Sequence, residues 1–539
     1  MAADGWRVHE MKQLPLGILQ LVAELYHGIE QGQAWPQINC LGCISCLPKT
    51  ELDVTNPKLE SGILAPDAFD TRPISNISPW TTIYSGLRFK QMAEWRENWL
   101  PASMHGARCK HETNDVAYEL QLLLEYSSIT HDHVAGIAFD RRKFFDLLPH
   151  DICFNILSCF GAPHTILTAE RAFYSQFQCL YKANVAMSSQ VRGRNNGFIQ
   201  GCSFSLQASL ALLSIWTRYI EDCMSPQATI SSGGFLDDNN FRSVAATAPA
   251  AVALLQIAWE RSQRFDTLAG IQINLSKTVC FGNTPQVRKL ICNQFCIEPF
   301  NLKLVNSFLL VGGMITTHGR TDKIAREKRV SKALARLKRG RYAPLAFNQR
   351  VLMTQTAILP VALYGCELHP LNKTEKEPLR RRVSSCLYKG HYWCRSPAEN
   401  FSFALPGHRL DAVQAAIYHT LHVARRIFLR RPELFLYYQK KFDHLSKGHT
   451  SIGPINNLFS AVTQLKCEWT SPTILVHQTG VSLNLLAASC EWSHTVRSFL
   501  RYMVWTEKAF QNRLDMVDAD PCKIDYESTV ALARAMQKG

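Results

Sequence analysis

The chain has 539 residues, of which 46% are hydrophobic and 19% are charged. A chain of this length usually divides into about two to four domains, and this composition excludes a largely disordered or fibrous protein. Lys and Arg number 59 against 44 Asp and Glu, which gives a formal net charge of +15. The natural partner of so basic a protein is a polyanion, with nucleic acid first and an anionic membrane second.

Secretion and membrane insertion are not expected. The first residues, MAADGWRVHEMKQLP, lack the basic region and apolar core of a secretory leader. The 18 cysteines are spread singly along the chain, which is typical of a reducing compartment. The longest apolar run, residues 246–259, is shorter than the roughly 20 residues that cross a bilayer. We therefore expect an intracellular protein without a signal peptide, a transmembrane segment or a membrane partner, and a buried helix at residues 246–259.

The first part of the chain mixes helical stretches, such as residues 16–32, with strand-like pieces and proline-marked turns, which predicts an α+β region. From about Gly136 to Gly313 the periodicity predicts a strand, a helix, a hairpin, a helix and a strand. These five elements are expected at residues 133–140, 206–223, 233–241, 250–265 and 270–282.

After Thr321 the pattern becomes that of long helices. The segment from Lys323 to Arg341 carries nine basic residues and one acidic residue. Further basic clusters follow at residues 380–382 and 425–431. The basic helix is either a solvated face or a surface for a nucleic-acid backbone, and its one-sided charge favours the second interpretation.

Three aspartates are candidates for catalysis. Asp237 and Asp238 are expected at the tip of the predicted hairpin, and Asp140 ends the strand-like GIAFD. Carboxylates that converge on one point repel one another unless cations neutralise them. A pair of Mg²⁺ ions, or Mn²⁺ in their place, would offset this repulsion, activate a primer 3′-hydroxyl and stabilise the leaving pyrophosphate.

Phosphoryl transfer also needs basic groups for a triphosphate and a surface for a base pair. Lys49 in LPKT and Arg72 in RPIS lie upstream of the acids, and Lys277 in NLSK follows the hairpin. Gln200 and Gly201 stand at the start of a predicted helix. These residues are the candidates for nucleotide binding.

The order of these motifs resembles that of the reverse transcriptases of non-long-terminal-repeat (LINE-type) retrotransposons. The opening DGWRVHEMKQLP and the later ILPVALYGCELHP are also similar to such elements, so the resemblance covers about residues 5–400. The matching strings are RPI at 72–74, DRRKFFD at 140–146, QGCSFS at 200–205, FLDD at 235–238, NLSK at 274–277 and FLLVGG at 308–313.

The resemblance implies a right-hand polymerase of the α+β class with a mostly helical C-terminal extension. Fingers and an N-terminal extension would occupy residues 1–135, and the palm would occupy 136–315, within a reverse transcriptase domain of about 45–315. A basic helical thumb would follow at 316–400. Residues 401–539 would form a helical extension of unknown role, whose amphipathic helices extend the thumb or contact RNA.

The resemblance also implies roles for the candidate residues. Asp140 and Asp237 would be the principal metal ligands with Asp238 beside them. Arg72 would contact the triphosphate of the incoming nucleotide, assisted by Lys49.

Three further roles concern nucleotide choice and the leaving group. Phe145 would collide with a ribose 2′-hydroxyl and so favour deoxynucleotides. Gln200 and Gly201 would support the templating base pair, because glycine lets the backbone approach closely. Lys277 would protonate the leaving pyrophosphate. The chain departs from the LINE pattern at Phe144, Cys202 and Ser203.

The partners implied are an RNA template, a DNA primer or target DNA, and deoxynucleoside triphosphates, in the nucleus. The tail shows no zinc knuckle and no clear set of nuclease carboxylates, so an endonuclease would be supplied by another chain or lost. A catalytically impaired descendant that binds RNA or an RNA–DNA hybrid is the alternative. An RNA-dependent RNA polymerase is a third possibility, which Phe145 opposes.

Two other groups of potential metal ligands have simpler interpretations. Cys40, Cys43 and Cys46 form a triplet without a fourth partner nearby, which favours small buried residues over a zinc site. The string HDH at residues 131–133 supplies too few ligands by the same count.

Overall fold

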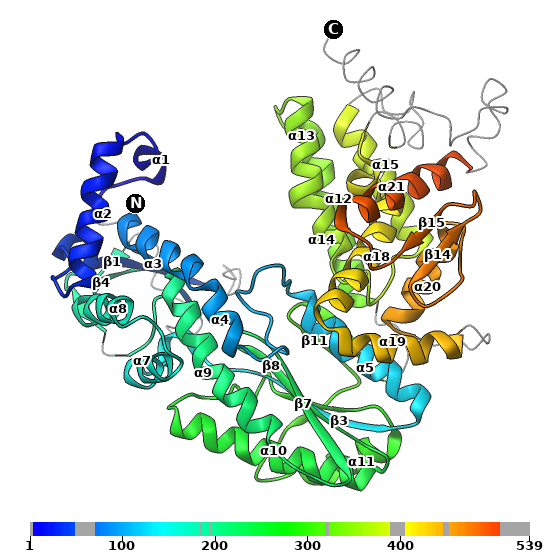
Figure 1. Ribbon diagram of the computed structural model, residues 1–539, viewed down its shortest axis with the longest axis horizontal. Helices are drawn as coiled ribbons and strands as arrows, with labels where there is room; N and C mark the ends of the chain where they lie inside the picture. The colour runs from blue at the N-terminus through cyan, green and yellow to red at the C-terminus, as the bar shows by residue number, and fades with distance from the viewer. Residues whose placement is uncertain are drawn as a thin grey trace, which may run out of the picture. The chain divides into compact units, whose positions relative to one another are not determined.

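The computed structural model describes residues 4–48, 71–183, 186–194, 196–317, 323–388, 401, 405–445 and 452–506 (Figure 1). The chain folds into two compact units. The first comprises the described residues of Met1–Cys109, Ile137–Arg242 and Ala253–Thr278, and the second those of Lys110–Gly136, Ser243–Val252 and Val279–Gly539. Each unit is discontinuous in sequence, so segments from different thirds of the chain share one core.

Helices of the first unit include the predicted N-terminal one, which forms as α2. Proline starts several of them: Pro79 follows the cap Ser78, whose hydroxyl accepts a hydrogen bond from the Trp80 amide. The helices are α1 Val8–Met11, α2 Leu16–Glu30, η1 Gln37–Cys40, α3 Pro79–Gln91, α4 Ala93–Trp99, α6 Phe144–Leu147, α7 His150–Cys159, α8 His164–Gln176, α9 Ser203–Glu221 and most of α10, Ala248–Leu268.

A five-stranded sheet near the N-terminus has the order β2-β1-β4-β5, with β6 also paired to β4. Strands β1 and β2 are antiparallel, with Leu47 opposite Arg72, whereas β1 and β4 are parallel. The strands are β1 Leu41–Pro48, β2 Thr71–Asn76, β4 Gln178–Ala183, β5 Ala186–Met187 and β6 Arg192–Gly193. Only β1 and β2 belong to the part of the chain where strand-like pieces were expected.

The second five-stranded sheet has the order β10-β9-β3-β8-β7 and carries the candidate acids. The predicted strand at 133–140 forms as β3, and the predicted hairpin forms from the neighbouring strands β7 and β8. The strands are β3 His133–Asp140, β7 Ala228–Phe235, β8 Asp238–Ala245, β9 Val279–Gly282 and β10 Lys303–Leu304.

An aromatic cluster joins helices α9 and α10 to this sheet, beside which both helices run in Figure 1. The ring centroid of Phe139 lies 5.6 Å from that of Trp216, 5.9 Å from Phe241 and 6.3 Å from Trp259. The Trp216 indole N–H donates to the Ser262 hydroxyl at 3.0 Å, so the one polar atom of this ring is bonded. All four rings are buried. The two helices thus hold the sheet from one side, next to the residue that precedes Asp140.

The second unit is mostly helical. Its helices are α5 Asn114–Thr130, α11 Pro285–Phe295, α12 Ile324–Tyr342, α13 Phe347–Met353, the π-helical turn η4 Thr354–Ile358, α14 Leu359–Leu363, α15 Lys373–Tyr388, α17 Gly407–Leu410, α18 Ala412–Arg430, α19 Pro432–Leu445, α20 Pro454–Gln464 and α21 Ser489–Trp505. Its hairpin is β11 Ser307–Leu310 with β12 Gly313–Thr316. A three-stranded sheet of β13 Cys467–Trp469, β14 Ile474–His477 and β15 Ser482–Asn484 interrupts the tail.

This mixture of helices and sheets agrees with the predicted α+β class. The long helices expected after Thr321 are present, and the tail helices expected from amphipathic periodicity form as α18 and α19. The small sheet in the tail was not predicted, because its strands are only three or four residues long and a pattern of that length is too short to recognise. No helix among the described residues has the length and apolar character needed to span a membrane.

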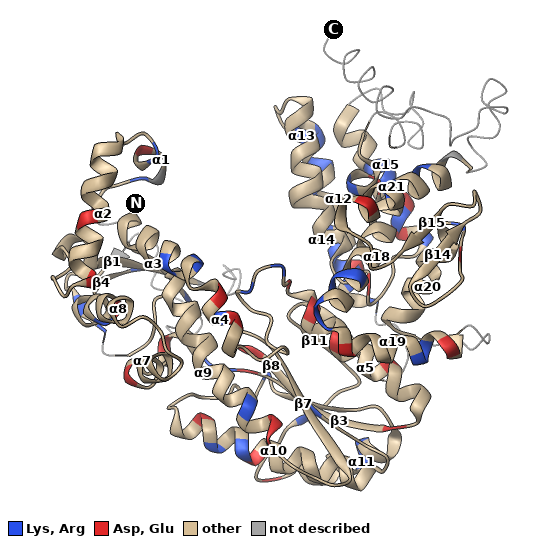
Figure 2. Ribbon diagram, viewed as in Figure 1, with Lys and Arg blue, Asp and Glu red and all other residues tan. Residues whose placement is uncertain are grey.

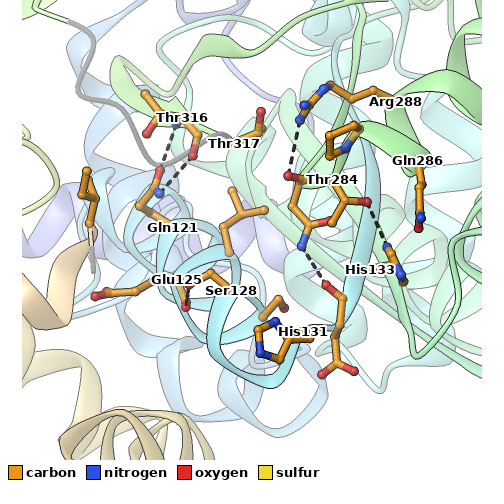
Figure 3. Close-up of a pocket in the computed structure, with 16 residues that line it drawn as sticks. Gln121, Glu125, Ser128, His131, His133, Thr284, Gln286, Arg288, Thr316 and Thr317 are labelled. Atoms are coloured by element: carbon orange, nitrogen blue, oxygen red, sulfur yellow. Dashed lines mark hydrogen bonds between the residues drawn. The ribbon is translucent and has the colours of Figure 1, made fainter. Parts of the chain in front are cut away.

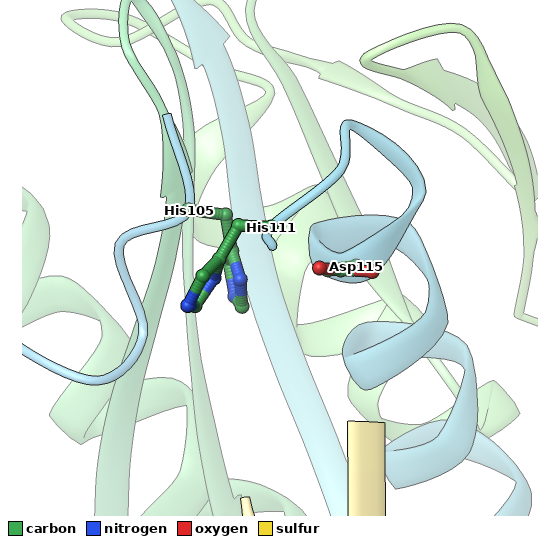
Figure 4. Close-up of side chains that lie close together, drawn as sticks. All are labelled: His105, His111 and Asp115. Carbon is green, nitrogen blue, oxygen red and sulfur yellow. The ribbon is translucent and has the colours of Figure 1, made fainter. Parts of the chain in front are cut away.

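Arginines of the two later basic clusters form ion pairs within the second unit. Arg426 and Arg430 pair with Asp115, which lies in the first turn of α5 and is labelled in Figure 4. Arg380 pairs at 2.9 Å with the buried Asp411, the residue that caps α18. These arginines tie helices of the unit together, whereas Arg381 and Arg382 are exposed. Figure 2 shows the lysines and arginines along the ribbon.

The basic helix α12 behaves differently. Its buried face carries Val330, Ala333 and Leu337, whereas Lys328 and Lys332 are exposed and have no acidic partner within the described part of the chain. Helical periodicity places these two lysines and Arg339 on one face. The helix therefore presents a one-sided basic surface, as the sequence predicted.

Candidate active site

The three candidate aspartates lie at one end of neighbouring strands in the first unit. Asp140 is the last residue of β3, and Asp237 and Asp238 belong to the turn and the first position of β8 in the adjacent hairpin. In that turn Leu236 has a φ of +56°, a conformation that a bulky side chain adopts only where its surroundings enforce it. The Asn239 side chain donates to the Leu236 carbonyl at 2.8 Å and closes the turn.

Lys277 reaches this site because the chain after α10 binds the end of β3. The Asn274 amide donates to the Asp140 carbonyl at 2.9 Å, and the Arg142 amide donates to the Gln272 carbonyl at 2.7 Å. The Lys277 amide then bonds back to the Asn274 carbonyl, so the chain turns toward the acids. The Lys277 ammonium lies 2.8 Å from Asp140 Oδ2.

This arrangement corrects the strand predicted at residues 270–282. Only Val279–Gly282 forms a strand, and the earlier half makes a single bridge, between Ile273 and Arg141, before it turns. The alternating pattern of GIQIN reflects residues that pack beside the end of β3 without joining the ladder.

The electrostatics of the acids fit a cation site. Burial, and then the neighbouring Asp237 and Asp140, raise the pKa of Asp238 to about 6, while Lys277 opposes them. Burial and Asp140 also raise the pKa of Asp237, against the opposing effects of its own backbone amide, Arg141 and Lys277. One exposed ammonium group does not offset three carboxylates, because its side chain is 65% exposed to water.

The acids are spread more widely than the ligands of a single ion. Their oxygens do not all lie within 4.8 Å of one another, since Asp140 turns toward Lys277. In two-metal sites the ions themselves are about 3.5–4 Å apart, so the ligand set is wider than one coordination sphere. Three carboxylates are also the oxygen donors that Mg²⁺ prefers. The residues present therefore fit a magnesium site.

Arg141 is a residue of this site that motif analysis missed. Its side chain is completely buried and pairs with Asp266 of α10 at 3.1 Å. Its guanidinium carbon lies 5.0 Å from the Phe139 ring centroid and 4.9 Å from that of Trp216. Arg141 lies directly after β3, whose residues 134–139 are all buried, so the sequence shows no polar–apolar alternation that could have revealed a buried arginine.

In the buried Arg141–Asp266 pair, the Arg141 guanidinium brings a positive charge to the core side of the site. It lowers the pKa of Asp237 and so favours the ionised form of that acid. Pairs of this kind specify geometry more than they stabilise, and loss of one partner alone typically costs about 3–5 kcal/mol. Arg141 thus ties the carboxylates to the aromatic cluster under the sheet.

A cavity of about 270 Å³ adjoins the hairpin and collects the residues predicted to receive the nucleotide. Phe145, Gln200 and Gly201 line it, together with Leu236, the residue before Asp237. Phe145 is half-buried there, whereas Phe144 is buried in the core. The departure from the family pattern at Phe144 therefore adds core volume and leaves the cavity to Phe145.

Gln200 is held in place at this cavity. Its side-chain amide donates to Asp146 at 3.4 Å, and Asp146 also pairs with Arg194 at 2.9 Å. Gly201 has a φ of +110°, which a residue with a side chain rarely adopts, and an added Cβ would lie 3.5 Å from the Ser75 carbonyl. Helix α9 starts two residues later, as predicted.

The Ser75 contact brings strand β2 next to the Gln200–Gly201 turn. Arg72 lies on the same strand and is exposed, on the sheet that contains β1 and not on the sheet of the acids. Lys49 follows the end of β1 and lies outside the described residues. The structure thus gathers seven of the nine predicted residues around the hairpin, and Arg72 stands apart from them on its own sheet.

The remaining predicted groups do not assemble ligands. In the ranges that the structure describes, neither the cysteine triplet Cys40, Cys43 and Cys46 nor the HDH string belongs to a group of three converging ligand atoms. His131 ends α5 with a φ of +59°, and His133 shares a hydrogen bond with the Thr284 hydroxyl at 2.9 Å. These residues serve the fold.

A larger cavity, of about 790 Å³, lies within the second unit (Figure 3). None of the predicted site residues lines it. Its walls bond to one another: the Gln121 amide donates to the Thr316 carbonyl at 3.1 Å and accepts from the Thr316 amide at 3.0 Å. Size alone does not mark the chemically active part of this protein, and the smaller cavity beside the acids is the better candidate.

Comparison with known proteins does not assign this chain to a family. No protein-family model matches the sequence, and no curated protein matches it. Among solved structures, telomerase from Candida tropicalis in complex with a TWJ fragment of telomeric RNA has a TM-score of 0.42 at 12% identity, over 82% of this chain and 67% of that chain. Apo telomerase from the same organism, truncated from its C-terminal domain, has a TM-score of 0.31 at 15% identity, over 56% of this chain and 59% of that chain. At these values the likeness assigns no function.

The raised pKa of Asp238 predicts a pH effect on stability when no divalent ion is added. The folded form holds this proton more tightly than the unfolded chain, where an aspartate titrates near pH 4. The contribution to the free energy of unfolding is therefore complete below about pH 4 and is lost as the pH rises through about 6. We expect Asp238→Asn to reduce this fall by roughly 2–3 kcal/mol in urea unfolding series between these pH values. The account would be contradicted if the free energy of unfolding fell equally with pH in the wild type and in Asp238→Asn. The exposed Asp222→Asn is the control and should behave as the wild type.

Proposed function

We propose that this protein is an RNA-directed DNA polymerase of a LINE-type retroelement, which adds deoxynucleotides to a primer 3′-hydroxyl on an RNA template. The observation that carries the proposal is the placement of Asp140, Asp237 and Asp238 on adjacent strands, beside Lys277 and next to a cavity lined by Phe145. In-line transfer of a nucleotidyl group depends on positioning and charge compensation, and this site supplies both.

The three aspartates would hold two Mg²⁺ ions, for which Mn²⁺ can substitute, and the ions would supply the charge that the attacking and leaving oxygens need. Arg141 opposes the rise in the pKa of Asp237 and so favours the ionised form that would coordinate a cation. The Lys277 ammonium lies 2.8 Å from Asp140 Oδ2, beside the acids that would hold the ions, and from there it would protonate the departing pyrophosphate.

The cavity beside the hairpin would receive the incoming nucleotide. The Phe145 ring would exclude a 2′-hydroxyl, and the bonded Gln200 side chain with Gly201 would support the templating base pair. Arg72, exposed on β2, would contact the triphosphate, with Lys49 assisting. Each of these roles follows from the resemblance to LINE-type reverse transcriptases.

At the level of domains, residues 1–135 would form the fingers with an N-terminal extension, 136–315 the palm and 316–400 the thumb. Residues 401–539 would extend the thumb. The exposed lysines of α12 would contact the phosphates of the template–primer duplex. The partners would be an RNA template, a DNA primer or target DNA and deoxynucleoside triphosphates in the nucleus, with an endonuclease supplied by another chain or lost.

Primer extension tests the proposal. The full chain is given poly(rA) with an oligo(dT) primer, Mg²⁺ and labelled dTTP, and Asp237→Asn is compared with the surface control Asp222→Asn. We expect incorporation by the wild type and the control, and a loss of at least roughly 10²–10³ in rate for Asp237→Asn. In a parallel lane with UTP in place of dTTP, we expect little incorporation by the wild type. Phe145→Val should incorporate about 10-fold or more UTP than the wild type.

Binding of the same RNA–DNA hybrid, measured by fluorescence anisotropy, distinguishes a polymerase from a protein that only binds nucleic acid. Wild-type protein that binds the hybrid and incorporates nothing would contradict the polymerase and favour a retained fold that only binds. Equal incorporation of dTTP and UTP would favour an RNA polymerase.

The basic face of α12 predicts the salt dependence of hybrid binding. Each phosphate contact adds about 0.7–0.9 to the slope of log K against log salt concentration. We expect Lys328→Gln with Lys332→Gln to lower this slope by roughly 1.5–2. A matched double variant of two exposed lysines elsewhere in the second unit, Lys289→Gln with Lys303→Gln, should leave it unchanged. An unchanged slope for the α12 variant would exclude this face from the duplex.

A further inference from the structure

A second group of ligand side chains lies in the second unit, on different elements from those of the aspartates. Cys366 and Glu367 belong to the turn that follows α14, and His419 stands in the middle of α18. One ligand atom from each residue lies within 4.8 Å of the other two. These are a thiol, a carboxylate and an imidazole, the three side-chain types that bind zinc in proteins.

The Glu367 carboxylate is the unusual member of the group. Its side chain is fully buried, and neither of its oxygens accepts a hydrogen bond from any described residue. His419 Nε2 lies 3.3 Å from Glu367 Oε2 and forms an ion pair with it when the imidazole is protonated. When the imidazole is neutral, this contact leaves the charge of the buried carboxylate uncompensated, which costs several kcal/mol, and a cation bound beside it would compensate that charge.

The backbone around these residues is held firmly. Gly365 has a φ of +78°, which lets the chain turn after α14 so that Cys366 and Glu367 follow directly. The Asn457 side chain of α20 donates to the carbonyls of Glu367 at 3.0 Å and Leu368 at 2.7 Å. A ligand turn fixed by bonds of this kind is pre-organised for an ion.

We propose that Cys366, Glu367 and His419 bind one Zn²⁺ ion. A cysteine thiolate and a carboxylate with a neutral imidazole balance the charge of a divalent ion. The thiol selects zinc over Mg²⁺ and Ca²⁺, which prefer oxygen ligands alone. Ligand atoms this close need to move by less than about 1 Å to reach the usual zinc distances of about 2.0–2.3 Å.

Binding would replace the thiol proton of Cys366, which passes to solvent, by a sulfur–zinc bond. The His419 side chain is 28% exposed, but its Nε2 atom is buried with the other two ligands, so a water molecule bound in the fourth position would be enclosed with the ion. The ion would join α18 to the turn whose Tyr364 hydroxyl donates to the Val311 carbonyl in the β11–β12 hairpin. The site would thus brace this hairpin against the helices of the same unit.

Metal analysis of the full chain tests the proposal. The protein is purified without a metal-affinity step, incubated with Zn²⁺, desalted and measured by mass spectrometry of the element. We expect the wild type to bind one equivalent of zinc, and Cys366→Ser and Glu367→Gln each to lose it. Outer-shell changes lower metal affinity 10–100-fold, and we expect the loss of a ligand to lower it by about 100-fold or more. Cys386→Ser, which removes a buried thiol of α15 that is not part of the group, should keep the zinc.

Cobalt substitution of the wild type keeps the test decisive if a variant does not fold. Co²⁺ should give the charge-transfer absorption of a sulfur–cobalt bond, and excess Zn²⁺ should displace it. A chelator should lower the unfolding temperature of the wild type and of Cys386→Ser. Wild-type protein that retains no stoichiometric zinc, or zinc content equal in the wild type and Cys366→Ser, would overturn the proposal and leave a simple Glu367–His419 ion pair.

Discussion

Repulsion among three carboxylates at the end of two adjacent strands is the constraint on which the rest of the first unit depends. Asp140 ends β3, and the hairpin turn delivers Asp237 and Asp238 beside it. Their partial burial strengthens the repulsion, as the raised pKa of Asp238 reflects. A chain that only needed a stable turn would gain by replacing these acids, so their placement indicates a site built for cations.

Residues in the core beside the acids offset part of the free-energy cost of this repulsion. Four buried aromatic rings and the Arg141–Asp266 pair fix the strands against α9 and α10, and Arg141 places a permanent charge behind Asp237. Leu236 has a left-handed conformation in the hairpin turn, which the Asn239 side chain closes. Rigidity of this kind lets a site keep groups together that would separate in a more mobile scaffold. The cavity lined by Phe145 and Gln200 uses the same hairpin as one wall, so the proposed nucleotide site and the three acids share one support.

Local pattern predicted the elements that local forces determine. Three elements could be predicted from the sequence: α10 from its apolar periodicity, the basic face of α12 from its lysines and arginines, and the β7–β8 hairpin from its turn residues. The resemblance of the motifs to reverse transcriptases placed the acids correctly in order along the chain. The irregular course of residues 270–278 was missed, because its bonds go to the end of β3 and no local pattern encodes them.

Contacts between distant segments escaped the sequence for the same reason. Arg141 and Asp266 are separated by 125 positions, and only the fold shows that they pair. The pairs of Arg426 with Asp115 and of Arg431 with Glu119 join residues that are 311 and 312 positions apart. The cluster of Cys366, Glu367 and His419 likewise has no spacing signature, because two of its members come from a turn and the third from a helix some 50 residues later.

Counting bound divalent ions tests the central claim most directly. Mn²⁺ is titrated into the full chain bound to an RNA template, a dideoxy-terminated primer and the next dNTP, and free Mn²⁺ is followed by electron paramagnetic resonance. The account predicts about two more tightly bound ions in the wild type and in Asp222→Asn than in Asp140→Asn. Equal numbers of bound ions in the wild type and Asp140→Asn would contradict it, since the repulsion among the acids would then be relieved by some means other than a metal ion.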